Sequence, residues 1–556
     1  MRKNEIVFAG ILSAITMICF YFRIFYGWDH DESYNILLAQ RIADGKILFK
    51  DMWDLHQTAA IFPALLCRIH VLLNGSTAGI AVFLRAMSVV VQIVLTVIVY
   101  SIIKRYYGVC CALGAGTVIA NMLPRATQEL EYSTISVWSC LICALLLFEI
   151  RREGFRLHKL LWAAFFYAVA VYSYPTIVIT VPFVAFLIVF IVSDERKQGL
   201  KYALLFFTLC AALACVLMIY LFSKMSVSEF IRIIHELGKN GDHSNWFNAF
   251  TNVDYIIKSG GRLLVLGAAA FVFSLMLKIV FKFDLNVVYS FVLLTTLLVV
   301  ILNVTGLRPS GPFGLLERYI GAAILMFFIG IKNEDKDFVW IFGGFGIAVY
   351  LGVLMGSNLG FNENAMYLES ALICLIVLLI KKLDDYSGGQ RKLALISAWV
   401  FIIGIVFTAG YFVRIDSTEP ANVTECDSTI ANGPLKGIRV FDEQNARFER
   451  QWASVYSHTE SGKLYTILTR EPIEYYFVNG DYISAQYAAT GQYYNEQWVD
   501  FYTLFERKLP DNFLVSKVDV DDISIFYKTE FGQWVMSEYE ENPSQSDDSY
   551  WVLDRK

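Results

Sequence analysis

An apolar run that ends in a cluster of acids decides the fold of this chain. Residues 6–34 read IVFAGILSAITMICFYFRIFYGWDHDESY. The stretch Ile6–Phe25 has the length of a helix that crosses a bilayer, and its last turns are rich in aromatic side chains. Three acids and a histidine follow at residues 29–32, where the chain leaves the hydrocarbon. Acids at this depth can face a lipid head group rather than a dissolved metabolite.

The rest of the chain repeats this pattern of apolar blocks. Of the 556 residues, 56% are hydrophobic and only 17% are charged. The apolar residues come in blocks of about 20, the span of a bilayer, rather than in alternation with polar ones. We therefore predict an α-helical polytopic membrane protein with about thirteen transmembrane helices.

Basic residues orient these helices. If the N-terminus lies in the cytoplasm, the inner segments carry most lysines and arginines, and the short outer loops carry only Arg125, Arg308 and Arg318. An odd number of spans then places the C-terminal region outside a plasma membrane. The apolar stretch 59–73 would invert this topology if it crossed the membrane. Because it contains Pro63 and Arg68, we interpret it as an interfacial helix in the outer head-group layer.

Two domains are expected. Residues 1–413 form the transmembrane domain, with long outer loops at 26–79 and 223–262. Residues 414–556 hold 13 Lys/Arg and 25 Asp/Glu, a net charge of 13 − 25 = −12. Short apolar strands alternate there with helix-like stretches, which predicts a small extracytoplasmic α/β domain.

Acids recur at the predicted outer ends of the spans. Asp31 and Glu32 follow the first span, Asp54 lies further along the same loop, and Glu131 precedes the fourth span. Solvation alone explains poorly why separate segments bring acids to one level of the membrane. A structural alternative is that the first cluster caps a helix beginning near Ser33, and both roles can hold at once.

Two outer arginines are candidate phosphate ligands. Arg308 and Arg318 lie beside apolar segments, and the arginine fork grips phosphate oxygens in pairs. The alternative is that they snorkel to the interface or pair with Glu317.

The N-terminal part of the chain resembles the C-type integral-membrane glycosyltransferases (GT-C), in particular the branch of protein O-mannosyltransferases and bacterial aminoarabinose transferases. The matching elements are Asp31-Glu32 followed by Tyr34, the segments 39–45 and 51–56, and Arg85 at the start of the second span. This resemblance covers the first 150 residues best.

The resemblance implies an enzyme that takes a sugar from a polyprenyl-phosphate donor and transfers it, with inversion, to a hydroxyl of a glycan, lipid or protein acceptor. Asp31 would be the catalytic carboxylate of the Asp31-Glu32 pair, with Glu32 beside it as a further catalytic candidate. Glu131 would be the catalytic acid of the second outer loop. Asp54 matches an acid that helps to bind a divalent metal ion in some members, with His56 as a second candidate ligand. Many relatives follow this acid with Lys-Pro or Pro-Pro, so His56 replaces a phosphate-gripping lysine here.

This chemistry has a physical rationale. A carboxylate within reach of the acceptor hydroxyl can accept its proton during attack on the anomeric carbon. Arginine, histidine or a metal ion beside the phosphate would stabilise the charge that develops on the leaving oxygen.

Other functions remain open at this point. A lipid-linked glycan polymerase or ligase would use the same acids, whereas a flippase or transporter should carry ionisable residues in mid-membrane. A scaffold that binds partners through its acidic outer domain is a further class. Walker loops, Rossmann glycine patterns and arginine-rich nucleic-acid signatures do not occur in the sequence, so we expect neither a nucleotide-sugar site nor a nucleic-acid partner.

Overall fold

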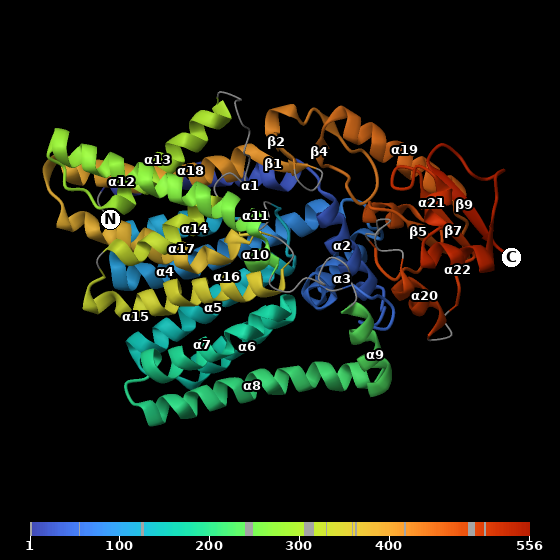
Figure 1. Ribbon diagram of the computed structural model, residues 1–556, viewed down its shortest axis with the longest axis horizontal. Helices are drawn as coiled ribbons and strands as arrows, with labels where there is room; N and C mark the ends of the chain where they lie inside the picture. The colour runs from blue at the N-terminus through green and yellow to red at the C-terminus, as the bar shows by residue number, and fades with distance from the viewer. Residues whose placement is uncertain are drawn as a thin grey trace.

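The structure is a computed structural model that describes residues 3–54, 56–123, 127–238, 248–304, 316–329, 331–357, 360–361, 364–415, 419–487, 495–504 and 508–556. A bundle of long helices occupies one side of the molecule, and the C-terminal region lies at one end of this bundle (Figure 1). We name this end the domain end, and the opposite end, where the N-terminus lies, the distal end.

The bundle is built from apolar helices, as the blockwise sequence predicts. Its helices are α1 (Lys3–Phe25), α4 (Ile80–Asn121), α5 (Tyr132–Glu153), α6 (Leu157–Ser173), α7 (Val181–Phe186), α8 (Arg196–Phe222), α10 (Asn248–Thr251), α11 (Val253–Tyr255), α12 (Gly261–Phe281), α13 (Val287–Val304), α14 (Leu316–Leu325), α15 (Lys336–Phe338), α16 (Phe345–Gly356), α17 (Glu369–Lys381) and α18 (Gly388–Tyr411).

Nine helices in the described part of the chain are long and apolar enough to cross a membrane. One of them, α4, contains 42 residues and bends at Gly108, whose φ of 84° favours glycine. Because α4 is long enough for two spans and several apolar helices are shorter, the predicted number of thirteen is not settled by this count. The predicted class, an α-helical polytopic membrane protein, is confirmed.

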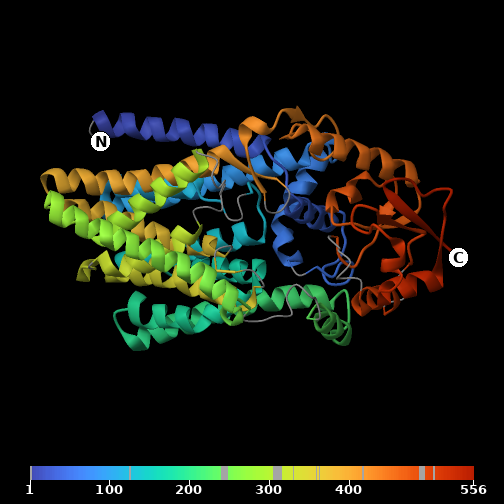
Figure 2. The same cartoon turned by 45° about the horizontal axis from the view of Figure 1, so that its top comes forward.

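A small group of helices separates the bundle from the C-terminal region. Figures 1 and 2 show α2 (His30–Ala43) and α3 (Ile61–Asn74) side by side at the domain end. The predicted interfacial stretch 59–73 thus corresponds to α3, although Gln57–Asn74 also meets the length and hydropathy of a span. In the second long loop, α9 (Val227–Leu237) begins at a capping box between Ser226 and Glu229.

The C-terminal region contains a five-stranded mixed sheet in the order β6-β5-β7-β9-β8. Strand β5 pairs in parallel with β6 and β7, and β9 runs antiparallel to β7 and β8. The strands of this region are β1 (Phe412–Ile415), β2 (Glu419–Asn422), β3 (Ser428–Thr429), β4 (Arg439–Val440), β5 (Leu464–Leu468), β6 (Asp481–Tyr482), β7 (Asn512–Ser516), β8 (Tyr539–Glu541) and β9 (Tyr550–Arg555), and its helices are α19 (Asp442–His458), α20 (Glu496–Thr503), α21 (Ile523–Phe526) and α22 (Glu530–Glu538).

The first loop is packed into this C-terminal region. The indole of Trp53 is fully buried, and its ring lies 5.3 Å from that of Phe501 at a steep angle. The backbone N–H of Trp53 donates to the carbonyl of Ala485 over 2.9 Å. The C-terminal region therefore holds the loop that carries Asp54 and His56.

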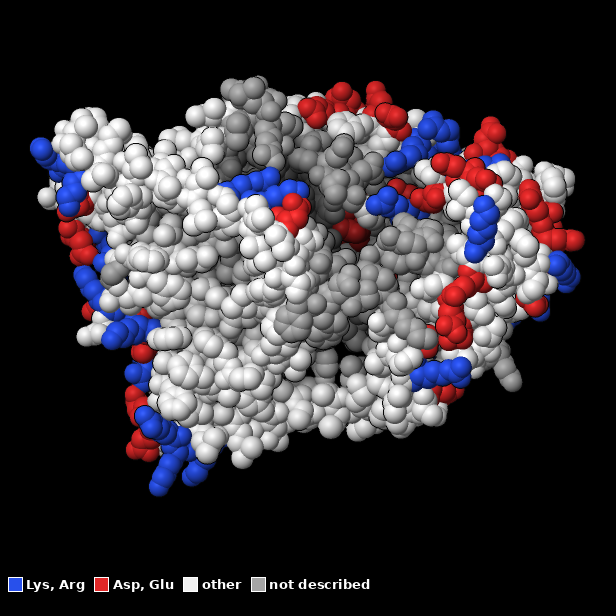
Figure 3. All heavy atoms as spheres, viewed as in Figure 1, with Lys and Arg blue, Asp and Glu red and all other residues white. Residues whose placement is uncertain are grey.

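Charged residues divide the surface into zones. Figure 3 shows Lys, Arg, Asp and Glu along the distal edge, a belt with few charges over the bundle, and a second charged zone over the C-terminal region. This distribution is typical of a protein whose middle lies in hydrocarbon.

Candidate active site

The site begins at the first turn of α2. Asp29 caps this helix, because its Oδ1 accepts the N–H of Asp31 over 2.9 Å. The predicted capping role thus belongs to Asp29, one turn earlier than expected. Asp29 is fully buried, whereas 27% of the Asp31 side chain remains exposed, and His30 Nε2 lies 3.3 Å from Asp31 Oδ1. Asp31 is therefore the acid of this turn that a substrate can reach.

Glu32, the next acid, is held by Arg85. Both oxygens of Glu32 accept from the Arg85 guanidinium over 2.6 Å, and both side chains are almost fully buried. Arg85 also donates to the carbonyls of Tyr26 and Gly27, at 3.2 and 2.7 Å. This bidentate pair fixes the turn between α1 and α2. The geometry gives Glu32 a positioning role, and its catalytic role stays a prediction.

The loop before α5 joins the same cluster. Glu131 caps α5, accepting the N–H groups of Ser133 and Thr134 over 2.7 and 2.6 Å. Asn35 Nδ2 donates both to the carbonyl of Asp31 and to Glu129 Oε1, at 2.9 and 3.0 Å. The loop bearing Glu129 and Glu131 therefore lies against the turn of Asp31, so the structure brings acids from separate segments together.

Glu129 is the acid in this loop whose environment is most perturbed. It is 4% exposed, and burial together with the nearby carboxylates of Glu32 and Glu131 raises its pKa well above the usual value. Glu129 lies two residues before Glu131 in the sequence, but nothing in the sequence pattern distinguishes it as a candidate site residue. Its burial depends on the contact between the loop before α5 and the first turns of α2, which the sequence does not show.

Asp54 contacts α2 through Tyr34. The carboxyl is 3% exposed, and burial raises its pKa to about 7, against hydrogen bonds from Tyr34 and from the backbone of Tyr487. Because Tyr34 lies three residues after Asp31 on α2, it connects Asp54 with the first turn of the helix. Tyr487 adds a contact from the C-terminal region.

His56 lies on an aromatic wall next to Glu131. Its imidazole stacks on the ring of Tyr132, with ring centroids 3.8 Å apart and planes 9° apart. Tyr174 lies 5.6 Å from the imidazole centroid, and the hydroxyl of Tyr367 donates to Ser133 Oγ over 3.1 Å. His56 is thus brought to the same region as the acids.

Three neighbouring side chains could hold a metal ion. Asp29, His30 and Asp31 each offer one ligand atom, and these atoms lie within 4.8 Å of one another. In the described part of the chain, Asp54 and His56 do not belong to such a three-ligand group. Two carboxylates and an imidazole are ligands that divalent ions such as Mn²⁺ or Zn²⁺ accept.

The two arginines expected to bind phosphate cannot be placed in this site. Arg308 lies outside the described residues. Arg318 belongs to the first turn of α14, and its side chain lies outside the described part of the structure. Both assignments stay predictions.

Comparisons with known proteins show similarity at the level of solved structures. No protein-family model matches the chain, and no curated protein matches it. ArnT from Cupriavidus metallidurans, bound to undecaprenyl phosphate, aligns with 100% of this chain and 98% of its own at 12% identity and a TM-score of 0.46. Its apo form aligns with 99% of this chain and 98% of its own, at 11% identity and a TM-score of 0.48.

The oligosaccharyltransferase of Archaeoglobus fulgidus, in complex with Zn and sulfate, is also similar. It aligns with 98% of this chain and 73% of its own, at 10% identity and a TM-score of 0.49. These neighbours are C-type membrane glycosyltransferases, the class that the N-terminal motifs resemble.

Proposed function

We propose that this protein is a membrane glycosyltransferase that moves a sugar from a polyprenyl-phosphate donor to a hydroxyl of a glycan, lipid or protein acceptor, with inversion. The observation that carries the proposal is the partly exposed carboxylate of Asp31 in a cluster of acids from two separate loops, which Asn35 links. The cluster lies at one end of an apolar helical bundle, where a lipid head group would reach it.

Asp31 is the proposed general base. Its carboxylate takes the proton of the acceptor hydroxyl while that oxygen forms a bond to the anomeric carbon. The bond between the anomeric carbon and the phosphate oxygen breaks on the opposite side of the sugar, and polyprenyl phosphate leaves. Attack from that side accounts for inversion. The Glu32–Arg85 pair and the Asp29 cap hold the helix turn that aims Asp31.

The leaving phosphate needs positive charge beside it. His56 is placed near the acids, and Arg308 and Arg318 are the further candidates. A divalent ion held by Asp29, His30 and Asp31 would supply Lewis-acid stabilisation of that phosphate.

An apolar pocket supports a lipid donor. Its volume is about 270 Å³, and its lining includes Ile256, Leu263, Ile320, Tyr350 and Leu368. Leu368 follows Tyr367, whose hydroxyl bonds to Ser133, the residue whose N–H Glu131 caps. Tyr367 and Ser133 therefore connect the segment that lines this pocket with Glu131, and we propose that isoprenyl units of the donor occupy the pocket.

The orientation proposed from the basic residues agrees with the arrangement of the chain. The N-terminus lies at the distal end and the C-terminal region at the other end (Figure 1). We propose that the N-terminus is cytoplasmic and that the acid cluster and the C-terminal domain, residues 414–556, face outward from the plasma membrane.

The proposal is tested by donor consumption. Purified full-length protein in liposomes is incubated with undecaprenyl- and dolichyl-phosphate sugars, with a hydroxyl acceptor mixture, and with or without a chelator. We expect release of polyprenyl phosphate from at least one donor. Movement of the donor between leaflets without cleavage would instead support a flippase, and an intact donor in every reaction would refute the proposal.

A further inference from the structure

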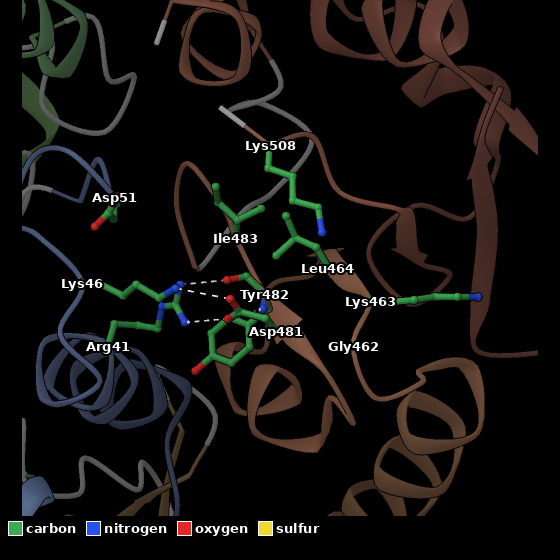
Figure 4. A pocket seen from close by; sticks show the side chains of 10 residues that line it. All are labelled: Arg41, Lys46, Asp51, Gly462, Lys463, Leu464, Asp481, Tyr482, Ile483 and Lys508. Carbon is green, nitrogen blue, oxygen red and sulfur yellow. Dashed lines mark hydrogen bonds and ion pairs between the residues drawn. The ribbon is translucent and has the colours of Figure 1, made fainter. Parts of the chain in front are cut away.

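A second pocket, which is polar, lies between α2 and the C-terminal sheet (Figure 4). Its volume is about 360 Å³, within the range of clefts that bind small molecules. The end of α2 and the loop after it form one wall, with Arg41, Lys46 and Asp51. The other wall comes from the segments 462–464 and 481–483 and from Lys508.

The charges of this pocket differ from those of its surroundings. Its lining includes four cations, but Lys463 extends away from the pocket (Figure 4) and pairs with Glu460 at 3.0 Å. Arg41, Lys46 and Lys508 against Asp51 and Asp481 leave a net charge of 3 − 2 = +1. The C-terminal region, residues 414–556, has 13 Lys/Arg against 25 Asp/Glu. A positive cleft in an acidic region concentrates the field and attracts anions to that place.

Arg41 is a rigid part of the wall. Its side chain is 3% exposed, with Nε donating to the hydroxyl of Tyr487 over 2.9 Å and Nη2 donating to the carbonyl of Tyr482 over 2.7 Å. The guanidinium also lies 4.2 Å from the centroid of the Tyr482 ring. This cation is therefore preorganised rather than a solvated surface charge.

The side chains of Lys46, Asp481 and Lys508 are more accessible than that of Arg41. Arg41 and Lys46 approach the two oxygens of Asp481 at 3.5 and 3.3 Å, so this one acid faces two cations. Figure 4 shows Lys508 reaching toward the pocket from the other wall. Its side chain is 67% exposed, and Asp511 lies 3.9 Å from its ammonium group. Lys508 is thus able to meet an anion without breaking a buried contact.

We propose that this pocket binds an acidic sugar residue through its carboxylate or phosphate group. Arg41, Lys46 and Lys508 would face the oxyanion, and the apolar atoms of Leu464, Ile483 and the Tyr482 ring would contact the sugar ring. Identification of this sugar as part of the acceptor rests on the proposed function.

The position of the pocket relative to Asp31 defines the length of such an acceptor. Asp31 and Arg41 belong to the same helix, α2, ten residues apart. A helix rises about 15 Å over this interval. The acidic sugar residue would therefore bind several sugar units away from the hydroxyl that attacks the donor. The proposed acceptor is then an acidic oligosaccharide rather than a free monosaccharide.

The test measures binding of simple probes to full-length detergent-solubilised protein in the absence of donor. Glucuronate presents a carboxylate, glucose 6-phosphate a phosphate, and glucose neither group. We expect at least one acidic sugar to bind, at least tenfold more tightly than glucose, and its binding to weaken as salt concentration rises. Lys508→Glu should weaken this binding at least tenfold and Lys508→Ala by a smaller factor, whereas Lys528→Ala, on the exposed surface outside the pocket, should leave it unchanged.

Equal binding of glucose and both acidic sugars, or unchanged binding by Lys508→Glu, would overturn the proposal. Preference for one acidic sugar over the other identifies the anionic group. Because no transfer is required, failure of this test is distinct from failure of the glycosyltransferase assignment.

Discussion

The acidic side chains at the two ends of the helical bundle differ in how they are paired. At the distal end, acids pair with basic side chains that are partly or largely exposed: Arg105 with Glu149 and Glu153, Arg151 with Asp194 and Asp337, Lys332 with Asp385, Lys381 with Glu334 and Asp335, and Arg391 with Asp384. At the domain end, Asp29, Asp31, Glu129 and Glu131 gather within two adjoining loops, while Arg85 is bound to Glu32.

This difference indicates that the ion pairs at the distal end are structural and that the carboxylate cluster at the domain end is functional. Exposed pairs each contribute about 0–1 kcal/mol and can be lost with little effect. Concentrating carboxylates in a buried cluster opposes folding, because each raises the pKa of its neighbours. Such clusters are characteristic of active sites.

The largest expected effect distinguishes the two ends by activity. Asp31→Asn keeps the size of the side chain but cannot accept the proton, so we expect transfer to fall about 10²- to 10⁴-fold. Glu153→Gln, at the distal end, should leave transfer within about twofold of the wild type, because Arg105 and Lys159 each keep Glu149 as a partner. The measurement is the rate of polyprenyl-phosphate release. Equal losses in both variants would contradict a functional difference between the ends.

Stability should also differ between the ends. Arg85→Met leaves Glu32 buried without its cation, which costs about 3–5 kcal/mol. Arg151→Met at the distal end removes two ion pairs and should cost about 2 kcal/mol or less. The temperature at which half of the detergent-solubilised protein aggregates reports both effects. The double variant Arg85→Met/Glu32→Leu should recover part of the loss, and no recovery would argue against a buried charge as its cause.

The pH dependence of stability sharpens the account of Asp54. Its pKa is about 7 in the folded protein, above the usual 3.8. The protonated Asp54 therefore stabilises the folded state fully below about pH 4, and this stabilisation is lost as pH rises to 7. Above pH 7 the loss is complete and amounts to at most about 4 kcal/mol. Asp54→Asn should be more stable relative to wild type at pH 8 than at pH 4, by aggregation temperature. The opposite order would show that the carboxylate form is stabilised.

A smaller effect is expected at His56. His56→Phe keeps a ring that can stack on Tyr132 but removes the nitrogens that would face phosphate. We expect the KM for the donor to rise about tenfold, consistent with loss of one hydrogen bond to a charged group, with aggregation temperature unchanged. An unchanged KM would assign His56 a packing role only.

Local patterns in the sequence predicted much of this structure. The first apolar run has a boundary that short-range reasoning detects. The predicted alternation of strands and helices in the C-terminal region is also present, with α19 before β5 and α20 before β7.

Contacts between distant segments could not be predicted in this way. Trp53 enters the core of the C-terminal region, and Asn35 links α2 to Glu129, although neither residue stands out from its neighbours in the sequence. Arg85 could be named as part of a resemblance, but its bidentate contact with Glu32 depends on how α1, α2 and α4 meet. Such pairings leave no periodic signal, and only the folded arrangement reveals them.

The central claim is that the acids of both loops form one cluster on the outer face of the membrane. Reaction with a membrane-impermeant maleimide tests it most directly, in intact cells expressing a cysteine-free protein with either His30→Cys or Lys282→Cys. We predict that the His30→Cys protein reacts without permeabilisation and that the Lys282→Cys protein, at the distal end, reacts only after it. Labelling in the reverse order would place Asp31 in the cytoplasm and contradict the account.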